Sequence, residues 1–280
     1  MTDDIPEITT IIPAHNRHAE LQRAVASALD QTIDRHEVIV VDDGSVPPIR
    51  GTDRLCDSRV RIIRSTGNNG AAAARNMGIA AARASIIAFL DSDDTWLPTK
   101  LQEQLALIDG AGLHGIVTGF NISDAFKSRS TEVIPDPVCG VFEFARGCWF
   151  SPGTTLLIRK AAFETIGLFD PTLRRLEDYE WFLRFGLAGG KLSVVPRVLA
   201  NIDVSLGGRP DAVKAAARVI CHSYDGRLPK RAQARVKAFT ALAEASAHLR
   251  AGRPLSAALP FLRSLAAVPR MRVQLQSGFA

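Results

Sequence analysis

The sequence has few cysteines, and their spacing is unlike that of a metal site or a disulfide framework. Its 280 residues include only four, Cys56, Cys139, Cys148 and Cys221, with no C-x-x-C pair. Scattered cysteines argue against structural zinc and indicate a reducing compartment. Residues 1–7 are acidic and polar, so we expect no signal peptide. No apolar run approaches the roughly 18 residues of a membrane-spanning helix, and we therefore expect a cytoplasmic protein.

A strong charge of one sign is absent from the chain as a whole but present in its C-terminal part. The formal net charge is +5. Residues 214–280 carry 12 Lys and Arg against two acidic residues, a balance of +10, whereas residues 1–213 carry 22 basic and 27 acidic residues, a balance of −5. A basic segment suits anionic lipid, a phosphorylated substrate or nucleic acid, or is a solvated helix face. Because this one has few aromatic side chains for base stacking, we expect no nucleic acid partner.

The first part of the chain alternates between strand-like and helix-like segments. Helix-like patterns cover 18–32, with a stripe of Leu21, Val25, Ala28 and Leu29, and the alanine-rich segment 71–84. Short apolar or β-branched runs cover 8–12, 37–41, 60–63, 86–90 and 115–119. This alternation predicts βαβ units, hence an α/β fold with a mostly parallel central sheet flanked by helices.

The pattern changes after residue 120. Residues 123–139 carry charges and prolines and are typical of a loop, and the last segment, from 211, is mostly helical. Pro260 is expected to kink or restart the last helix. We predict a domain at 1–210, divided into halves 1–120 and 121–210, and a basic helical extension at 211–280. Within 121–210 we expect strands at 154–158 and 192–199 and a helix at 176–187.

Three carboxylates follow the apolar run 86–90, in the segment Asp91-Ser92-Asp93-Asp94. In open α/β sheets, ligands bind at the carboxyl ends of the strands. Carboxylates so close together repel one another unless a cation lies between them, and Mg²⁺ and Mn²⁺ accept carboxylate and phosphate oxygens. The segment therefore indicates a site for a metal and a diphosphate, or else the acidic start of a helix.

Four other segments carry candidate functional groups, although each also has an ordinary structural explanation. Residues 11–17 include Pro13 and His15, which can flank a base, or which belong to a turn and a helix cap. Asp43 follows the second strand, where an acidic group can bind a base or ribose, or form an Asp-Gly turn. Arg75 lies one turn into a helix and can contact a diphosphate. Asp178 belongs to a Glu-Asp pair near two aromatic residues. It can act as a general base, or it can simply place negative charge at a helix start, where the helix dipole favours it.

Taken in order, these segments resemble glycosyltransferase family 2. The matching patterns are I-I-P-x-x-N, V-V-D-D-G-S, N-x-G-x-x-x-A-R-N, L-D-x-D-D and a late E-D, within residues 8–204. The resemblance implies a GT-A fold, which is Rossmann-like, and an inverting enzyme that uses a nucleotide-sugar, a UDP-sugar above all. It also implies Mg²⁺ or Mn²⁺ as cofactor and a saccharide or lipid-linked acceptor in bacterial cell-surface polysaccharide or glycolipid synthesis.

The resemblance also assigns roles to individual residues. Asp178 is expected to be the catalytic base, and Arg75 to lie beside the diphosphate. Many relatives have Tyr at the position of His15, which leaves the identity of the base open. The donor-binding residues are expected to be Pro13, His15, Asp43, Arg75, Asp91 and Ser92, and the metal ligands Asp91, Asp93 and Asp94.

Two other functions were considered for the whole chain, and one more for its C-terminal segment. A protein that keeps the fold but only binds the nucleotide-sugar, or serves as a scaffold, would lack the D-x-D pair or the base, and both are present. A phosphatase with a D-x-D-x-T motif would carry it after the first strand, whereas Asp91–Thr95 follows the fourth. Residues 214–280 either pack on the body of the protein or make peripheral contact with an anionic membrane, at the inner face of the plasma membrane.

Overall fold

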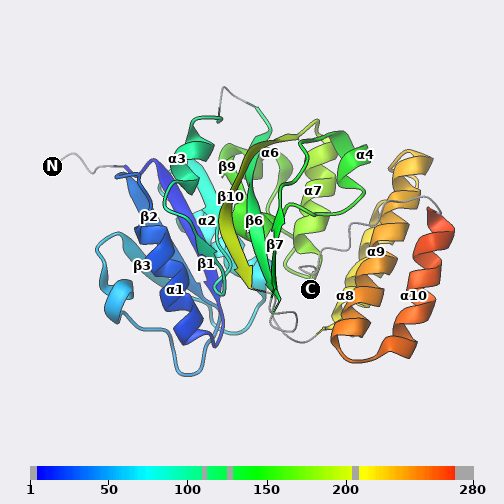
Figure 1. Cartoon of the computed structure of the whole chain (residues 1–280), viewed down its shortest axis with the longest axis horizontal. Coiled ribbons are helices and arrows are strands. Elements are labelled where there is room, and N and C mark those ends of the chain that lie inside the picture. The colour runs from blue at the N-terminus through cyan, green and yellow to red at the C-terminus, as the bar shows by residue number, and fades with distance from the viewer. Residues whose placement is uncertain (1–4, 109–111, 125–128, 204–207, 269–280) are drawn as a thin grey trace.

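The protein is described by a computed structural model, which covers residues 5–108, 112–124, 129–203 and 208–268. Its centre is a mixed sheet with helices on both sides (Figure 1), in which ten strands lie within the described residues. Four strands at one side are parallel, in the order β3-β2-β1-β4. Their bounds are β1 Ile8–Ala14, β2 His36–Asp42, β3 Val60–Arg64 and β4 Ile86–Phe89.

The helices between these strands form where the periodicity predicts them. In α1 (His18–Leu29) the expected stripe of Leu21, Val25, Ala28 and Leu29 is buried. The helix α2 (Ala71–Ala81) packs closely on β1, because a Cβ at Gly78 would lie 2.4 Å from Ile11 Cγ2. β2 is buried along its whole length, as expected for a strand covered on both faces. The predicted α/β class is therefore confirmed.

Beyond β4 most strand pairs are antiparallel, so the parallel arrangement does not extend through the whole sheet. β9 (Leu157–Arg159) runs antiparallel between β4 and β6 (His114–Asp124), while β10 (Lys191–Asp203) is parallel to β6. β5 (Thr95–Trp96) and β8 (Val138–Cys139) pair antiparallel with β10. β7 (Arg129–Val133) pairs antiparallel with β6, because so short a connection permits a hairpin but no crossover. The expected loop at 123–139 thus contains β7 and β8, and its residues 125–128 lie outside the described part.

A cluster of aromatic side chains forms the core beside the sheet. It surrounds α7 (Glu177–Leu187), whose Trp181 and Phe182 are buried. Phe150 packs edge-to-face on Phe182 with ring centroids 4.9 Å apart, so this ring belongs to the core. The smaller helices around the sheet are η1 Asp53–Cys56, α3 Lys100–Leu105, α4 Gly140–Phe144, α5 Pro152–Thr155 and α6 Ala161–Ile166.

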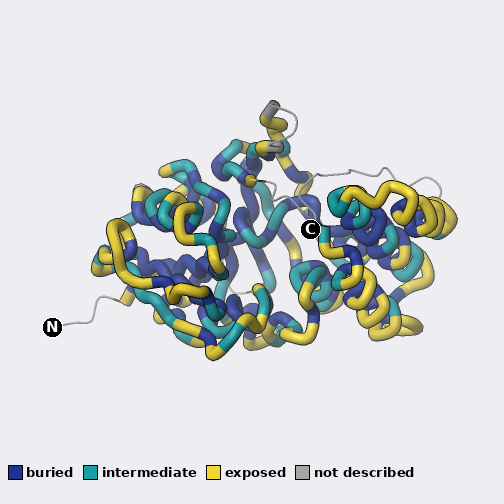
Figure 2. The backbone as a smooth tube through the Cα atoms, turned by 90° about the horizontal axis from the view of Figure 1, so that it is seen from below, coloured by how far each residue is buried: buried dark blue, intermediate teal, exposed yellow. Residues whose placement is uncertain are grey.

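The C-terminal helices are α8 (Pro210–Ser223), α9 (Lys230–Arg250) and α10 (Pro254–Ala267), at the right of Figure 1. Phe239 of α9 lies 4.4 Å from the Tyr179 ring, centroid to centroid, so this part of the chain joins the central core. α10 continues through Pro260, which is buried, and no restart occurs there. Most residues of the sheet are buried, whereas most residues of α10, at the outer edge of the molecule, are exposed (Figure 2). Within the described residues, none of the helices has the length and apolarity needed to cross a bilayer.

Candidate active site

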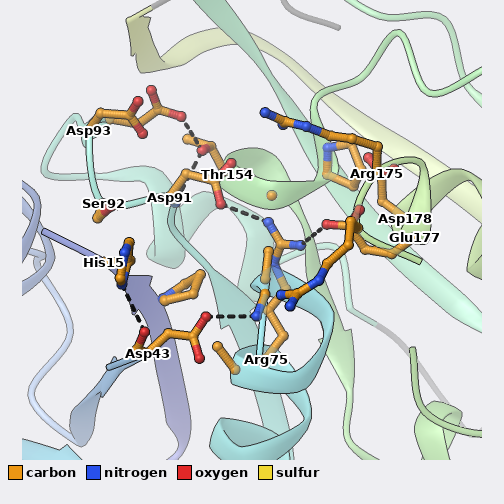
Figure 3. Close-up of a pocket in the computed structure, with 18 of the residues that line it drawn as sticks. His15, Asp43, Arg75, Asp91, Ser92, Asp93, Thr154, Arg175, Glu177 and Asp178 are labelled. Carbon is orange, nitrogen blue, oxygen red and sulfur yellow. Dashed lines mark hydrogen bonds and ion pairs between the residues drawn. The ribbon is translucent and has the colours of Figure 1, made fainter. Parts of the chain in front are cut away.

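A pocket of about 370 Å³ opens at the carboxyl ends of β1, β2 and β4. Its lining combines strand-end residues with segments from the second half of the chain, and Figure 3 shows their side chains facing one another. Every residue predicted for the site lines it: Pro13, His15, Asp43, Arg75, Asp91, Ser92, Asp93, Asp94 and Asp178. The five separate motifs of the sequence therefore converge on one cavity.

His15 and Asp43 form one end of the pocket. The two carboxylate oxygens of Asp43 accept the backbone N–H groups of Asn69 and Gly70, at 2.9 and 2.7 Å. His15 Nδ1 donates to the backbone carbonyl of Asp43 at 2.8 Å, which places the imidazole proton on Nδ1 because a carbonyl only accepts. Asp43 thus fixes the N-x-G segment in addition to lining the pocket.

Arg75 connects the two acidic segments of the site. Its Nη2 donates to Asp91 Oδ1 and its Nη1 to Glu177 Oε1, both at 2.8 Å (Figure 3). The residue is only 6% exposed, and the two carboxylates help to keep its pKa above the usual value despite burial. Residues 102 positions apart are joined in this way, so the guanidinium holds the D-x-D segment against the start of α7.

Asp93 and Asp94 have different environments. Asp93 Oδ2 pairs with Arg17 Nη1 at 2.5 Å, and burial followed by the charge of Asp91 raises the pKa of Asp93. Asp94 is buried, accepts the Asp203 backbone N–H at 3.0 Å and also accepts the Thr154 hydroxyl. Burial, then the charge of Asp91, raises its pKa well above the usual value. Asp94 therefore ties β10 and Thr154 to the acidic segment.

The carboxylates fit a divalent cation that also takes ligands from a substrate. Within the described ranges, no three His, Cys, Asp or Glu side chains are placed so that they could hold a metal by themselves. Mg²⁺ is commonly held by one or two carboxylates together with substrate phosphates. Asp91 Oδ2 has no hydrogen-bond partner among the described residues, and the Gly153 Cα leaves room beside it, where a Cβ would approach to 2.5 Å. Asp91 is therefore better placed as a ligand than Asp94, whose two carboxylate oxygens both accept hydrogen bonds.

Asp178 lies at the first turn of α7, next to the Arg75–Glu177 ion pair. Burial, followed by the charge of Glu177, raises its pKa to about 7, although Arg75 acts in the opposite direction. Tyr179 and Trp181 anchor the helix, since their polar atoms donate to Ala145 O at 3.0 Å and Gly167 O at 2.7 Å. A carboxylate with this pKa can accept a proton near neutral pH.

The structure adds residues that the sequence does not indicate. Arg17 follows the first motif, yet only the fold brings it to Asp93. Thr154 reaches Asp94 across 60 positions, and Arg175 and Arg209 line the pocket from segments without a recognisable motif. Distant pairs of this kind have no signal in a single sequence.

A Rossmann-like sheet with this acidic pocket at its strand ends has the architecture of the GT-A glycosyltransferases. The S. aureus TarS fragment 1–349 in complex with UDP has the same fold, with a TM-score of 0.62 over 97% of this chain and 95% of that fragment, at 15% identity. Residues 9–167, more than half of the chain, match the sequence model of glycosyl transferase family 2. The chain belongs to this family.

Curated relatives agree with this assignment. The succinoglycan biosynthesis protein ExoO of Rhizobium meliloti is 39% identical over 208 residues, covering 69% of this chain and 60% of ExoO. The pre-mycofactocin glycosyltransferase of Mycobacterium tuberculosis is 28% identical over 216 residues, covering 70% of this chain and 43% of that protein. The matched part of this chain thus spans about half of the length of these two relatives.

Proposed function

We propose that the protein transfers a sugar from a nucleoside-diphosphate sugar to an acceptor hydroxyl, with inversion at the anomeric carbon. The observation that carries this proposal is the chain of contacts Asp91–Arg75–Glu177, which sets the D-x-D segment beside Asp178 in one pocket. A UDP-sugar is the donor that we favour, because TarS, which has the same fold, forms complexes with UDP and UDP-GlcNAc. We assign the reaction to residues 1–210.

In the reaction, Asp178 accepts the proton of the acceptor hydroxyl while the hydroxyl oxygen bonds to the anomeric carbon. The bond from that carbon to the diphosphate oxygen breaks on the opposite face, which inverts the configuration without a covalent intermediate. A cation held by Asp91 and Asp93 would neutralise negative charge on the leaving diphosphate. Arg75 keeps Asp91 and Glu177 in place and adds a positive charge beside the diphosphate.

The donor's nucleoside is assigned to the other end of the pocket. His15 and Pro13 flank the base, Asp43 contributes a carboxylate oxygen to it, and Ser92 lines the passage toward the diphosphate. The carboxylate of Asp43 already accepts two backbone N–H groups, so its orientation is set before the donor binds. A preorganised acceptor of this kind reduces the entropic cost of binding.

A role in bacterial surface polysaccharide or glycolipid synthesis is supported by the relatives. ExoO is named for succinoglycan biosynthesis, and a relative from Erwinia amylovora, AmsB, for amylovoran biosynthesis. By analogy, we propose a saccharide or lipid-linked acceptor for this chain. The alternative, a protein that binds the nucleotide-sugar without turnover, is disfavoured because the D-x-D pair and Asp178 lie in one pocket.

The outer face of α10 supports the proposal of peripheral membrane contact at the inner face of the plasma membrane. Leu255, Leu259 and Leu262 are 92%, 57% and 60% exposed, which is unusual for a row of leucines on one helix. The surrounding segment 214–280 is strongly basic, although its residues 269–280 lie outside the described part. Leucines next to basic residues suit an anionic bilayer surface.

Nucleotide binding provides the test of the donor proposal. Melting temperatures are measured with UDP, GDP, dTDP or CMP, each with Mn²⁺ and with EDTA. We expect UDP to stabilise the protein only with Mn²⁺ and to have no metal-dependent effect on the Asp91→Asn variant. The Arg197→Gln variant is the control, because Arg197 is exposed and pairs with Glu103 outside the pocket. The absence of a shift with any nucleotide would contradict the proposal.

A further inference from the structure

The C-terminal helices form one wall of the pocket. Val213 of α8 and Ala243 of α9 line it, beside Leu176. The segment just before α8 packs closely on α9, since a Cβ at Gly208 would lie 1.9 Å from the carbonyl oxygen of Ala247. Leu176, which precedes Asp178 by two positions, packs against Val213 and Ala243. Figure 3 shows Asp178 on the opposite side of the pocket from His15 and Asp43. Residues of α8 and α9 therefore build the end of the pocket near Asp178, opposite the end assigned to the nucleobase.

Two arginines at this end have no partner among the described residues. Arg175 and Arg209 both line the pocket, and neither side chain forms a hydrogen bond or an ion pair with a described residue. The Nε of Arg175 is buried and has no hydrogen-bond acceptor. Arg75 also has a buried Nε without an acceptor, but its terminal nitrogens, like that of Arg17, pair with carboxylates. A buried guanidinium nitrogen without an acceptor costs stability, which a bound anion would offset.

The positive charges at this end also act on one another. Burial, followed by the charge of Arg209, lowers the pKa of Arg175, even though Glu177 and Asp178 act in the opposite direction. Burial and the charge of Arg175 lower the pKa of Arg250 to about 10. A potential of this sign attracts anions into the pocket.

The residue after Arg175 has an unusual backbone conformation. This residue, Leu176, has φ 60° and ψ 20°, in the left-handed region that a bulky residue seldom occupies. Strained conformations of this kind persist mainly at functional sites. Figure 3 shows the Arg175 side chain extending from the α7 side over the pocket, above Asp178 and toward Thr154.

We propose that Arg175 and Arg209 bind a phosphate group of the acceptor, so that the acceptor is a phosphate-bearing saccharide. This inference rests on the proposed function, because Asp178 must meet the acceptor hydroxyl on the same side of the pocket. A phosphate could also come from the donor's diphosphate. The acceptor is favoured because the two arginines adjoin the wall formed by α8 and α9, whereas the residues assigned to the donor's nucleoside occupy the opposite end.

The test uses inorganic phosphate as the probe and calorimetric titration of the whole protein, without and with saturating UDP and Mn²⁺. We expect phosphate to bind the UDP-saturated protein, with affinity at least tenfold weaker in Arg175→Gln and in Arg209→Gln. The affinity for UDP should stay within twofold of wild type in both variants. Arg175→Lys retains the charge and should recover part of the phosphate affinity. Arg197→Gln serves again as the matched control and should bind phosphate as wild type does.

Several results would overturn the inference. If UDP affinity falls tenfold in Arg175→Gln and UDP displaces phosphate from the wild-type protein, the arginines serve the donor. Phosphate that does not bind, or that binds the two Gln variants as tightly as wild type, also contradicts it.

The proposed function fails separately. If UDP does not bind the wild-type protein but both Gln variants still lose phosphate affinity, the anion site stands and the donor assignment is wrong. Arg209 is exposed, so its variant remains informative if Arg175→Gln unfolds.

Discussion

Replacing Asp178 by Asn should make the protein more stable at pH 8 while removing its activity. The carboxylate has a pKa of about 7 in the folded protein, against an ordinary value of 3.8 for Asp, because of burial and the neighbouring charge of Glu177. Since the folded pKa is the higher one, the folded protein binds the proton more tightly than the unfolded chain. The ionised group therefore destabilises the fold, fully above pH 7 and hardly at all below pH 4.

The size of the effect follows from this difference in pKa. Three pKa units correspond to about 4 kcal/mol, at 1.36 kcal/mol per unit, and this is a ceiling. Asn keeps an oxygen that can accept the Tyr179 backbone N–H, which Asp178 accepts at 2.7 Å, so little else is lost. Because Glu177 relaxes when its neighbour becomes neutral, we expect a gain of roughly 1–3 kcal/mol in the free energy of unfolding at pH 8. The gain should be less than half as large at pH 5.

Urea denaturation of both proteins at pH 5 and pH 8 measures the free energy of unfolding without any substrate. Release of nucleoside diphosphate from the donor, with acceptor present, measures turnover and should fall by about 10²–10⁴ in the variant, the usual loss for a general base. Wild-type kcat/KM should rise with pH to a plateau, with an apparent pKa near 7. A variant that is less stable than wild type at pH 8 would refute the electrostatic argument, and wild-type turnover would refute the assignment of the base.

Three further outcomes are expected. Asp91→Asn should lower Mn²⁺-dependent UDP affinity at least tenfold in titration calorimetry, and an unchanged affinity would exclude Asp91 as a ligand. Gly78→Ala should lower the free energy of unfolding, measured by urea denaturation, by about 1–3 kcal/mol, because the new Cβ would lie 2.4 Å from Ile11 Cγ2. An unchanged free energy of unfolding would show that α2 can shift. Changing Leu255, Leu259 and Leu262 to Ser should weaken sedimentation of the protein with anionic vesicles. The melting temperature should stay nearly unchanged because these side chains are exposed. Equal sedimentation of the variant and the wild-type protein would contradict membrane contact through α10.

Local patterns were sufficient to predict the first four strands and the two helices between them. The apolar runs and the stripe of Leu21, Val25, Ala28 and Leu29 reflect burial that depends on neighbours a few positions away. The direction of β9 and the pairing of β7 with β6 had no such local signal. Strand direction depends on how the connections run through space, and β7 falls in a segment that composition alone marks as a loop.

The candidate site divides in a similar way. The acidic segments were recognisable because each occupies consecutive positions after a predicted strand or at a helix start. The pairing of Arg75 with both Asp91 and Glu177 was not, and neither was the engagement of Asp94 by Thr154 and Asp203. Asp94 was expected to be a metal ligand. Because it is buried and its carboxylate already accepts two hydrogen bonds, it is less suited to that role than Asp91.

The sequence by itself determined the family, the alternation of strands and helices, and the residue types available for chemistry, because these properties reside in short ordered motifs. Only the tertiary structure decided which charges are neutralised and which are not. Arg17 and Arg75 pair with carboxylates, whereas Arg175 and Arg209, equally basic in the sequence, remain without a partner in the described part of the chain. The reason is physical: an electrostatic interaction depends on distance and burial, and folding sets both between residues that are far apart along the chain.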